Sequence, residues 1–168
     1  TRYSKITRRY ESRCTMMEIK KATIEDIDTL MSWRMEVLHD VFSIEENLDM
    51  SELRANNHAY YLNAIPNGEH IACFACIDGE IVGCGGICIY REMPSPDNKN
   101  GLCAYLMNIY THPMFRKQGV AKAVVNWLIE QTKQKEITKI YLETSDKARS
   151  LYSSLGFSDM KGYMKLGI

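Results

Sequence analysis

One stretch constrains the fold more than any other, because residues 105–130 combine a strand, a turn and a helix. Residues 106–111 are rich in β-prone side chains, and the run stops at His112-Pro113 because proline cannot donate to a sheet ladder. Beyond a short turn, apolar residues recur three and four positions apart, which predicts a helix with one buried face. These residues are Ala121, Val124, Val125, Leu128 and Ile129. The sequence therefore predicts a turn placed directly at a helix N-terminus.

This turn, Arg116-Lys117-Gln118-Gly119-Val120-Ala121, has the residues that an anion site needs. The first N–H groups of a helix lack partners within it, and the helix dipole adds partial positive charge. Gly119 lets a ligand approach the main chain, while Arg116 and Lys117 add full charges. The pattern predicts a pyrophosphate cradle, and a tight turn with solvated basic side chains is the alternative for the hexapeptide alone. Neither a Gly-Lys-Ser/Thr loop nor a three-glycine dinucleotide fingerprint is present, which argues against kinase and NAD-dependent functions.

The length and charge of the chain indicate one domain with a small partner. A chain of 168 residues is long enough for one substantial core and too short for two ordinary domains. Lysine plus arginine equals aspartate plus glutamate at 21 each, so no overall field favours nucleic acid or a membrane. No apolar run reaches the roughly 18 residues that a membrane span needs. We therefore expect neither a nucleic-acid nor a membrane partner.

The six cysteines are expected to be buried free thiols. Cys73-x-x-Cys76 resembles half of a zinc or redox site, but residues three apart on a strand face opposite sides of the sheet. We expect no metal at these cysteines. Free thiols indicate a reducing compartment, and the predicted location is cytoplasmic.

The first 16 residues differ in character from the rest of the chain. They carry five basic side chains against one acid, with no apolar centre behind them. We interpret residues 1–16 as a basic leader, either upstream sequence or an addition introduced for expression, before a start near Met16 or Met17. Residues 17–168 are expected to form a single domain. Nucleic-acid binding through the leader is a further hypothesis that its charge raises.

Local signals place the remaining elements. A capping box at Thr23 predicts a helix that continues to about Val41, and Asp78-Gly79 predicts a tight hairpin turn. Gly156 is expected to end a helix in left-handed geometry. Strands are predicted at 18–22, 71–77, 81–90, 106–111, 140–144 and 157–166, and further helices at 52–63 and 147–155. The mixture of strands and helices predicts an α+β fold.

Two motifs, in order, resemble those of a known family. Arg116-x-x-Gly119-x-Ala121 follows Asn108-Ile-Tyr-Thr-His-Pro, and Ala148-x-x-x-Tyr152-x-x-x-Gly-Phe follows at the expected distance. Together they resemble the signatures of the GNAT family, the Gcn5-related N-acetyltransferases, and the resemblance extends over nearly everything from Met17 onward. It implies a three-layer α+β fold, with a central mixed, mostly antiparallel, twisted sheet flanked by helices. This sheet is splayed between the fourth and fifth strands to admit acyl-CoA.

The resemblance also implies roles for individual residues toward acetyl-CoA, the co-substrate. The main chain around Ile109, Tyr110 and Thr111 would pair with the pantetheine arm. The residues that would hold the pyrophosphate are Arg116, Lys117, Gln118, Gly119, Val120, Ala121 and Lys122. Ser145 stands where many members have an asparagine that contacts the pantetheine. Tyr152 matches the general acid that protonates the leaving thiolate, and a packed aromatic is its alternative role.

On the acceptor side, Asn108 occupies the position where some members carry a glutamate base. Asn108 and Tyr110 fall on one face of their strand and are expected to line the cleft. Glu45 and Glu46, in the first connector between helices, are candidates for accepting the proton of the amine. Their alternative is an ordinary solvated charge cluster.

These expectations predict an acetyl-CoA-dependent N-acetyltransferase that acts by direct attack of a primary amine in a ternary complex. No cysteine or serine occurs in a recognisable nucleophile-plus-base motif, which favours direct transfer. The acceptor is a small-molecule or peptide amine, and a homodimer is possible because dimers are common in the family. A non-catalytic acyl-CoA-binding or sensing module is the alternative, since no base is evident.

Overall fold

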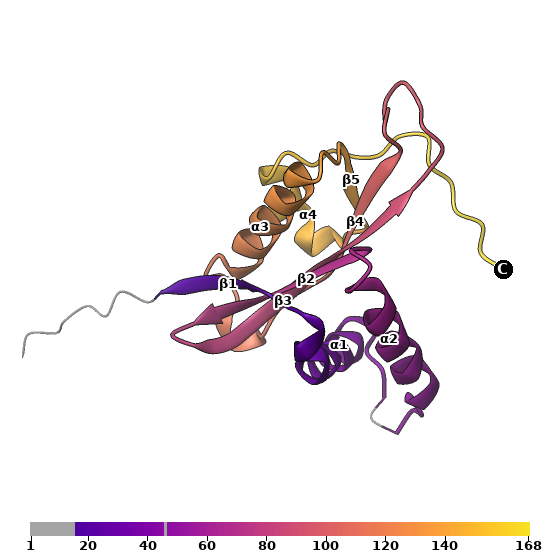
Figure 1. The fold of residues 1–168 in the computed structure, drawn as a ribbon. Helices are drawn as coiled ribbons and strands as arrows, with labels where there is room; N and C mark the ends of the chain where they lie inside the picture. Colours follow the sequence, from indigo (N-terminus) through magenta and orange to yellow (C-terminus); the bar gives the residue numbers. More distant parts are fainter. Residues whose placement is uncertain (1–15, 46) are drawn as a thin grey trace, which may run out of the picture.

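The computed structural model describes residues 16–45 and 47–168. The predicted leader therefore lies outside the described residues except for Met16, and so do Cys14 and Glu46. In the described part, five strands form one sheet in sequence order (Figure 1). The strands are β1 (Met17–Lys21), β2 (His70–Ile77), β3 (Glu80–Arg91), β4 (Leu102–Thr111) and β5 (Lys139–Leu142). The first three pairings are antiparallel and β4 pairs with β5 in parallel, which confirms the predicted mixed sheet.

Helices cover both faces of this sheet. They are η1 (Ile24–Asp26), α1 (Ile27–Phe42), α2 (Ser51–Ala64), η2 (Pro113–Phe115), α3 (Val120–Gln134) and α4 (Asp146–Ser154). Figure 1 shows α1 and α2 on one side, and α3 with α4 on the other. The crossover from β4 through α3 to β5 explains the parallel pairing, since parallel neighbours need a long connection. The predicted three-layer α+β architecture is confirmed.

Two apolar clusters fill the spaces on either side of the sheet. Val124, Val125 and Leu128 of α3 belong to one, and Met31 of α1 belongs to the other. The two cysteines of the Cys-x-x-Cys motif are divided between them, Cys73 in the first and Cys76 in the second. They face opposite sides, as the strand period predicts, and cannot share a metal ion. The five described cysteines are free, and the described residues contain no group of three or more His, Cys, Asp or Glu able to hold a metal ion.

The glycines of β3 allow α3 to approach the sheet closely. A Cβ added at Gly85 would lie 2.4 Å from Val124 Cγ1, and one at Gly83 would lie 2.9 Å from Val120 Cγ1. The ladder between β3 and β4 also shifts register between Cys84 and Gly86. The glycines of β3 thus lie both at a point of close packing and beside a bulge.

Two strand predictions need correction. The strand predicted at 157–166 is wrong, because this mostly exposed segment turns at Gly162 (φ +85°) and forms no ladder with β5. Its contacts are made by side chains instead: Asp159 pairs with Arg149, and the Lys139 ammonium lies 5.6 Å from the Tyr163 ring. β4 begins at Leu102, four residues before its predicted start.

Among the described residues, no helix combines the length and the apolar character that crossing a membrane requires.

Candidate functional site

A cleft opens where β4 and β5 separate. The two strands pair only from Cys103 with Lys139 to Leu106 with Leu142, whereas β4 continues to Thr111. After Leu142 the chain leaves the sheet and enters α4 at Asp146. A pocket of about 470 Å³, here called the cleft pocket, lies at this divergence between α1, β4 and α4. The second half of β4 therefore presents an edge that β5 does not cover.

A bulge in β4 lies in the wall of the cleft pocket. Gly86 pairs with Met107 and Cys84 pairs with Tyr110, so two residues of β4, Asn108 and Ile109, stand opposite one residue of β3. Asn108 has φ +59°, in the left-handed region of backbone conformation that residues other than glycine seldom adopt. Such a bulge changes the direction in which main-chain and side-chain groups point, and it interrupts the ladder beside the cleft.

Asn108 and Tyr110 both pack toward α1, in agreement with their expected common face. The Asn108 side-chain oxygen accepts a hydrogen bond from Arg34 Nη1 at 3.0 Å. The Tyr110 ring is buried and meets Trp33 edge-on, with ring centroids 6.2 Å apart. Asn108 lines the cleft pocket, whereas Tyr110 lines a separate surface hollow beside Asp40. Only Asn108 of this pair reaches the cleft with its side chain.

The turn that follows β4 has the geometry of an anion site. Lys117 (φ +62°) and Gly119 (φ +82°) both adopt left-handed backbone, and α3 begins at Val120. Within the described residues, the N–H groups of residues 118–122 donate to no protein group, and the first helical bond runs from Ala123 N–H to the Gly119 oxygen at 3.0 Å. A Cβ added at Gly119 would meet no atom within 4 Å. Five successive N–H groups are thus available at a helix N-terminus with open space beside them.

The basic residues near this turn behave differently from one another. Lys117 and Lys122 are exposed and form no ion pair with any described residue. Arg116 instead donates from Nε to the Thr111 oxygen and from Nη2 to Asp40 Oδ2, each at 3.1 Å. It therefore joins the end of β4 to α1, and its contact with a diphosphate stays a prediction.

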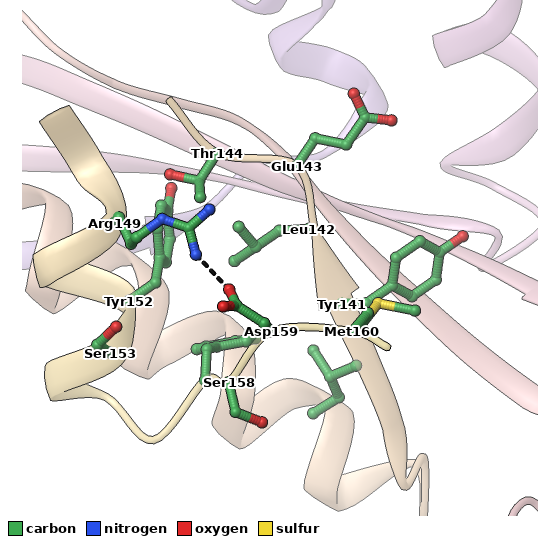
Figure 2. Close-up of a pocket in the computed structure, with 12 residues that line it drawn as sticks. Tyr141, Leu142, Glu143, Thr144, Arg149, Tyr152, Ser153, Ser158, Asp159 and Met160 are labelled. Atoms are coloured by element: carbon green, nitrogen blue, oxygen red, sulfur yellow. Dashed lines mark hydrogen bonds and ion pairs between the residues drawn. The ribbon is translucent and has the colours of Figure 1, made fainter. Parts of the chain in front are cut away.

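Tyr152 lies between two pockets. It lines the cleft pocket and also a pocket of about 500 Å³ on the outer side of β5 (Figure 2). The residue is 9% exposed, and its ring meets Phe157 edge-on at 5.9 Å. Its hydroxyl donates to no described residue, and burial raises the pKa of Tyr152. The phenol is therefore protonated at neutral pH, which is the state that a proton donor needs.

Figure 2 shows that Arg149 of α4 and Asp159 of the C-terminal segment form an ion pair in the wall of this outer pocket. The Tyr152 hydroxyl points toward Thr144, and the Glu143 carboxylate points away from the Arg149–Asp159 pair. Glu143 also lines the cleft pocket. Ser145 is the residue before α4 and lines the cleft pocket, but its hydroxyl makes no capping bond.

The structure brings some of the predicted residues together and leaves others apart. Asn108, Ile109, Ser145 and Tyr152 all line the cleft pocket. Glu45 is exposed in the connector after α1 and lines none of the pockets described here, while Glu46 lies outside the described residues.

Sequence reasoning missed two charged residues of the cleft pocket, Arg34 and Glu143. Arg34 shares the helical spacing of Leu30, Met31 and Leu38, a pattern that indicates a core face. An arginine within an otherwise apolar stripe was the signal that could have found it.

Comparison with known proteins agrees with this geometry. The model of the acetyltransferase (GNAT) family matches residues 27–157. The uncharacterized N-acetyltransferase YjgM of Escherichia coli (strain K12) is 34% identical over 83 residues, which make up 48% of this chain and 46% of that protein. The match thus spans about half the length of this curated relative.

Solved structures extend the likeness to nearly the whole chain. A predicted acetyltransferase from Clostridium acetobutylicum, crystallised with acetyl-CoA, is 30% identical, with a TM-score of 0.80 over 90% of this chain and 96% of that chain. The aminoglycoside N-acetyltransferase AAC(6')-Iy in complex with CoA is 17% identical, with a TM-score of 0.70 over 94% of this chain and 97% of that chain. At that identity the second likeness concerns the fold alone.

Proposed function

The chain belongs to the acetyltransferase (GNAT) family, and from this premise we propose that it transfers an acetyl group from acetyl-CoA to an amine by direct attack in a ternary complex. The observation that carries the proposal is the run of five unpaired N–H groups at residues 118–122, placed next to the strand edge that β5 leaves open. This arrangement can bind an elongated thioester that has a diphosphate at one end.

The turn at residues 116–121, predicted to be a pyrophosphate cradle, would bind the diphosphate of acetyl-CoA. Unpaired N–H groups and the helix dipole favour an anion at the start of α3, and the open space at Gly119 lets it approach the main chain. Lys117 and Lys122 supply full charges at the mouth. The pantetheine arm would then lie along the uncovered edge of β4, beside Ile109 and Thr111 and near Ser145.

Tyr152 is the proposed proton donor. In the reaction the amine nitrogen bonds to the carbonyl carbon, the carbon–sulfur bond breaks, and the thiolate takes the phenolic proton. General acid catalysis of this kind contributes about a hundred- to ten-thousand-fold to a rate. Its place in the wall of the cleft pocket and its raised pKa support this role.

The attacking ammonium must also lose a proton. Glu143 replaces Glu45 as the proposed proton acceptor, because its carboxylate borders the cleft pocket and Glu45 does not. It is exposed, so transfer through a water molecule to the bulk is open to it.

The test is release of free CoA thiol from acetyl-CoA in the presence of a panel of amines. Tyr152→Phe should lower kcat at least a hundred-fold while the dissociation constant for acetyl-CoA changes less than three-fold, because the ring and its packing remain. Tyr163→Phe, which removes a hydroxyl from an exposed residue of the C-terminal segment, is the matched control. Equal turnover of the Tyr152 variant and the wild type, with chemistry rate-limiting, would remove the assigned role.

A non-catalytic acyl-CoA-binding or sensing module is the second candidate. It is favoured by the exposure of Glu143, because a solvated carboxylate is a weak base and Glu143 is the carboxylate that lines the cleft pocket. Stabilisation by acetyl-CoA without thiol release for any amine would support this function and contradict the first.

A further inference from the structure

A smaller pocket of about 290 Å³, here called the side pocket, adjoins the cleft pocket. Arg34, Met107 and Asn108 line both pockets, so these three side chains form the wall between them. The other lining residues are Asn57, Tyr60, Tyr61, His70 and Cys88. The side pocket is therefore connected to the reaction cleft at the β4 bulge.

Arg34 brings a positive charge to this wall without an acidic partner. Its Nε donates to Asn57 Oδ1 at 2.9 Å and its Nη1 donates to Asn108 Oδ1 at 3.0 Å, and both acceptors are neutral amide oxygens. Among the described residues, no carboxylate lies within ion-pair distance of its guanidinium. The group is partly buried, and a guanidinium has five N–H donors, so donors and charge remain for a ligand. A carboxylate is the anion whose geometry matches this planar fork.

The rest of the side pocket is uncharged, and three of its lining residues carry aromatic rings. His70 is 5% exposed and meets the rings of Tyr60 and Tyr61 edge-on at 5.4 and 5.5 Å. Burial, together with the charge of Arg34, lowers the pKa of His70 to about 4, so the imidazole is neutral at physiological pH. Its Nδ1 lies 3.0 Å from the Tyr60 hydroxyl. Among the lining residues, Arg34 is thus the charged one, and the remainder suits an apolar or aromatic group.

We propose that the acetyl acceptor is an α-amino acid, or a small amine built like one, whose carboxylate pairs with Arg34 and whose apolar side chain occupies the side pocket. This inference rests on the proposed function. An α-amine lies two bonds from the carboxylate carbon, so a carboxylate on Arg34 keeps the amine at the wall shared with the cleft pocket, which Tyr152 also lines. A volume of about 290 Å³ suits a single side chain and is small for an oligosaccharide. The amine nitrogen gains the acetyl carbon and loses a proton, while the CoA sulfur loses that carbon and gains a proton.

The first experiment compares acceptors that differ only in the carboxylate. The two pairs are L-phenylalanine with 2-phenylethylamine, and L-leucine with isoamylamine. Two further acceptors without a carboxylate are kanamycin and spermidine. At saturating acetyl-CoA, and corrected for the fraction of unprotonated amine, kcat/KM should be about ten- to a hundred-fold higher for the amino acid of a pair, the range typical of a hydrogen bond to a charged group.

The second experiment uses Arg34→Gln and Arg34→Lys. Each should lower kcat/KM for the amino acid and leave kcat/KM nearly unchanged for the matched amine. The ratio of the two values should therefore fall toward one, and it should fall less in Arg34→Lys than in Arg34→Gln. The ratio within one preparation does not depend on the fraction of protein that is folded. Arg54→Gln, which removes a positive charge from the exposed surface of α2, should keep the wild-type preference.

The outcomes separate the inference from the function on which it rests. Turnover of amines without a carboxylate at rates equal to or above those of the amino acids would overturn the inference and leave the acetyltransferase function intact. An equal loss for both members of a pair in Arg34→Gln would reduce Arg34 to a structural role. Absence of thiol release with every amine would contradict both proposals.

Discussion

Two arginines show how the neighbours of a residue decide what its charge can do. Arg116 lies in the motif that predicts anion binding, yet its guanidinium contacts Asp40 and the Thr111 oxygen, and it lies 5.7 Å from the Tyr110 ring. Arg34 lies within a helical stripe that predicts only core packing, yet it contacts two neutral amides and borders two pockets. The motif drew attention to Arg116, whereas what the charge of Arg34 can do follows from its neighbours in three dimensions.

Gly119 offers a test of the cradle at the scale of one residue. Gly119→Ala should cost about 1 kcal/mol of unfolding free energy, because alanine is strained at φ +82°. It should also weaken CoA binding about ten-fold or more, since the methyl group enters the space beside the unpaired N–H groups. Gly68→Ala is the control, as Gly68 has φ +72° and equally open surroundings. Calorimetric titration should show a weaker affinity for CoA in Gly119→Ala and an unchanged affinity in Gly68→Ala. Equal affinities in the two variants would contradict the proposed binding of the diphosphate at this turn.

His70 predicts a dependence of stability on acidity. The folded chain keeps this imidazole neutral down to a pKa of about 4, whereas the unfolded chain binds the proton near 6.5. The contribution of His70 to the unfolding free energy is therefore complete above pH 6.5. As the pH falls from 6.5 to 4, the unfolding free energy decreases by about 3 kcal/mol. Urea unfolding at several pH values should show His70→Asn losing less stability over this window than the wild type. The matched control is His58→Asn on the exposed surface of α2, and parallel curves for wild type and His70→Asn would disprove the prediction.

At the scale of elements, the sequence predicts what local chemistry determines. The periodic apolar residues of α3, the capping box at Thr23 and the Asp78-Gly79 turn all lie where they were expected. The strand at 157–166 fails because its apolar residues satisfy a local pattern, whereas a strand also needs a partner to share its ladder. The bulge at Asn108 could not be predicted either, since it depends on the register between β4 and β3. For the same reason the side pocket, built from α1, α2 and three strands, has no sequence motif.

The contact between α3 and β3 yields a prediction about packing. Gly85→Ala should destabilise the protein by about 1 to 3 kcal/mol, because its methyl group would lie 2.4 Å from Val124 Cγ1 and 2.9 Å from Ile109 Cδ1. Val124→Ala alone should cost about 2 kcal/mol through the cavity that it leaves. The double variant should lose about 1 kcal/mol less unfolding free energy than the two single variants lose together, since the smaller side chain at position 124 makes room for the methyl group. Denaturant unfolding of the four proteins measures this coupling, and strict additivity would mean that α3 moves away from the sheet instead.

At the scale of the whole molecule, the proposed binding of acetyl-CoA depends on an incomplete sheet. β4 and β5 pair over four residues only, and the two sides of the cleft pocket beyond them belong to different parts of the chain, β4 with α1 on one side and residues 143–152 on the other. With a formal net charge of zero, the protein has no long-range field to attract an anion. The proposed affinity for a diphosphate would therefore come from the local N–H groups and lysines at the start of α3.

This dependence predicts how ligands stabilise the protein. CoA at a hundred times its dissociation constant should raise the unfolding free energy by about 2.7 kcal/mol, which corresponds to a rise in Tm of about 5 to 10 °C for a chain of this size. Pantetheine at the same concentration can occupy the edge of β4 but has no diphosphate for residues 118–122, so it should raise Tm by less than about 2 °C. Scanning calorimetry with each compound measures the difference, and inorganic pyrophosphate controls for unspecific anion binding. Equal stabilisation by CoA and pantetheine would place the affinity in the cleft between the strands and not at the start of α3.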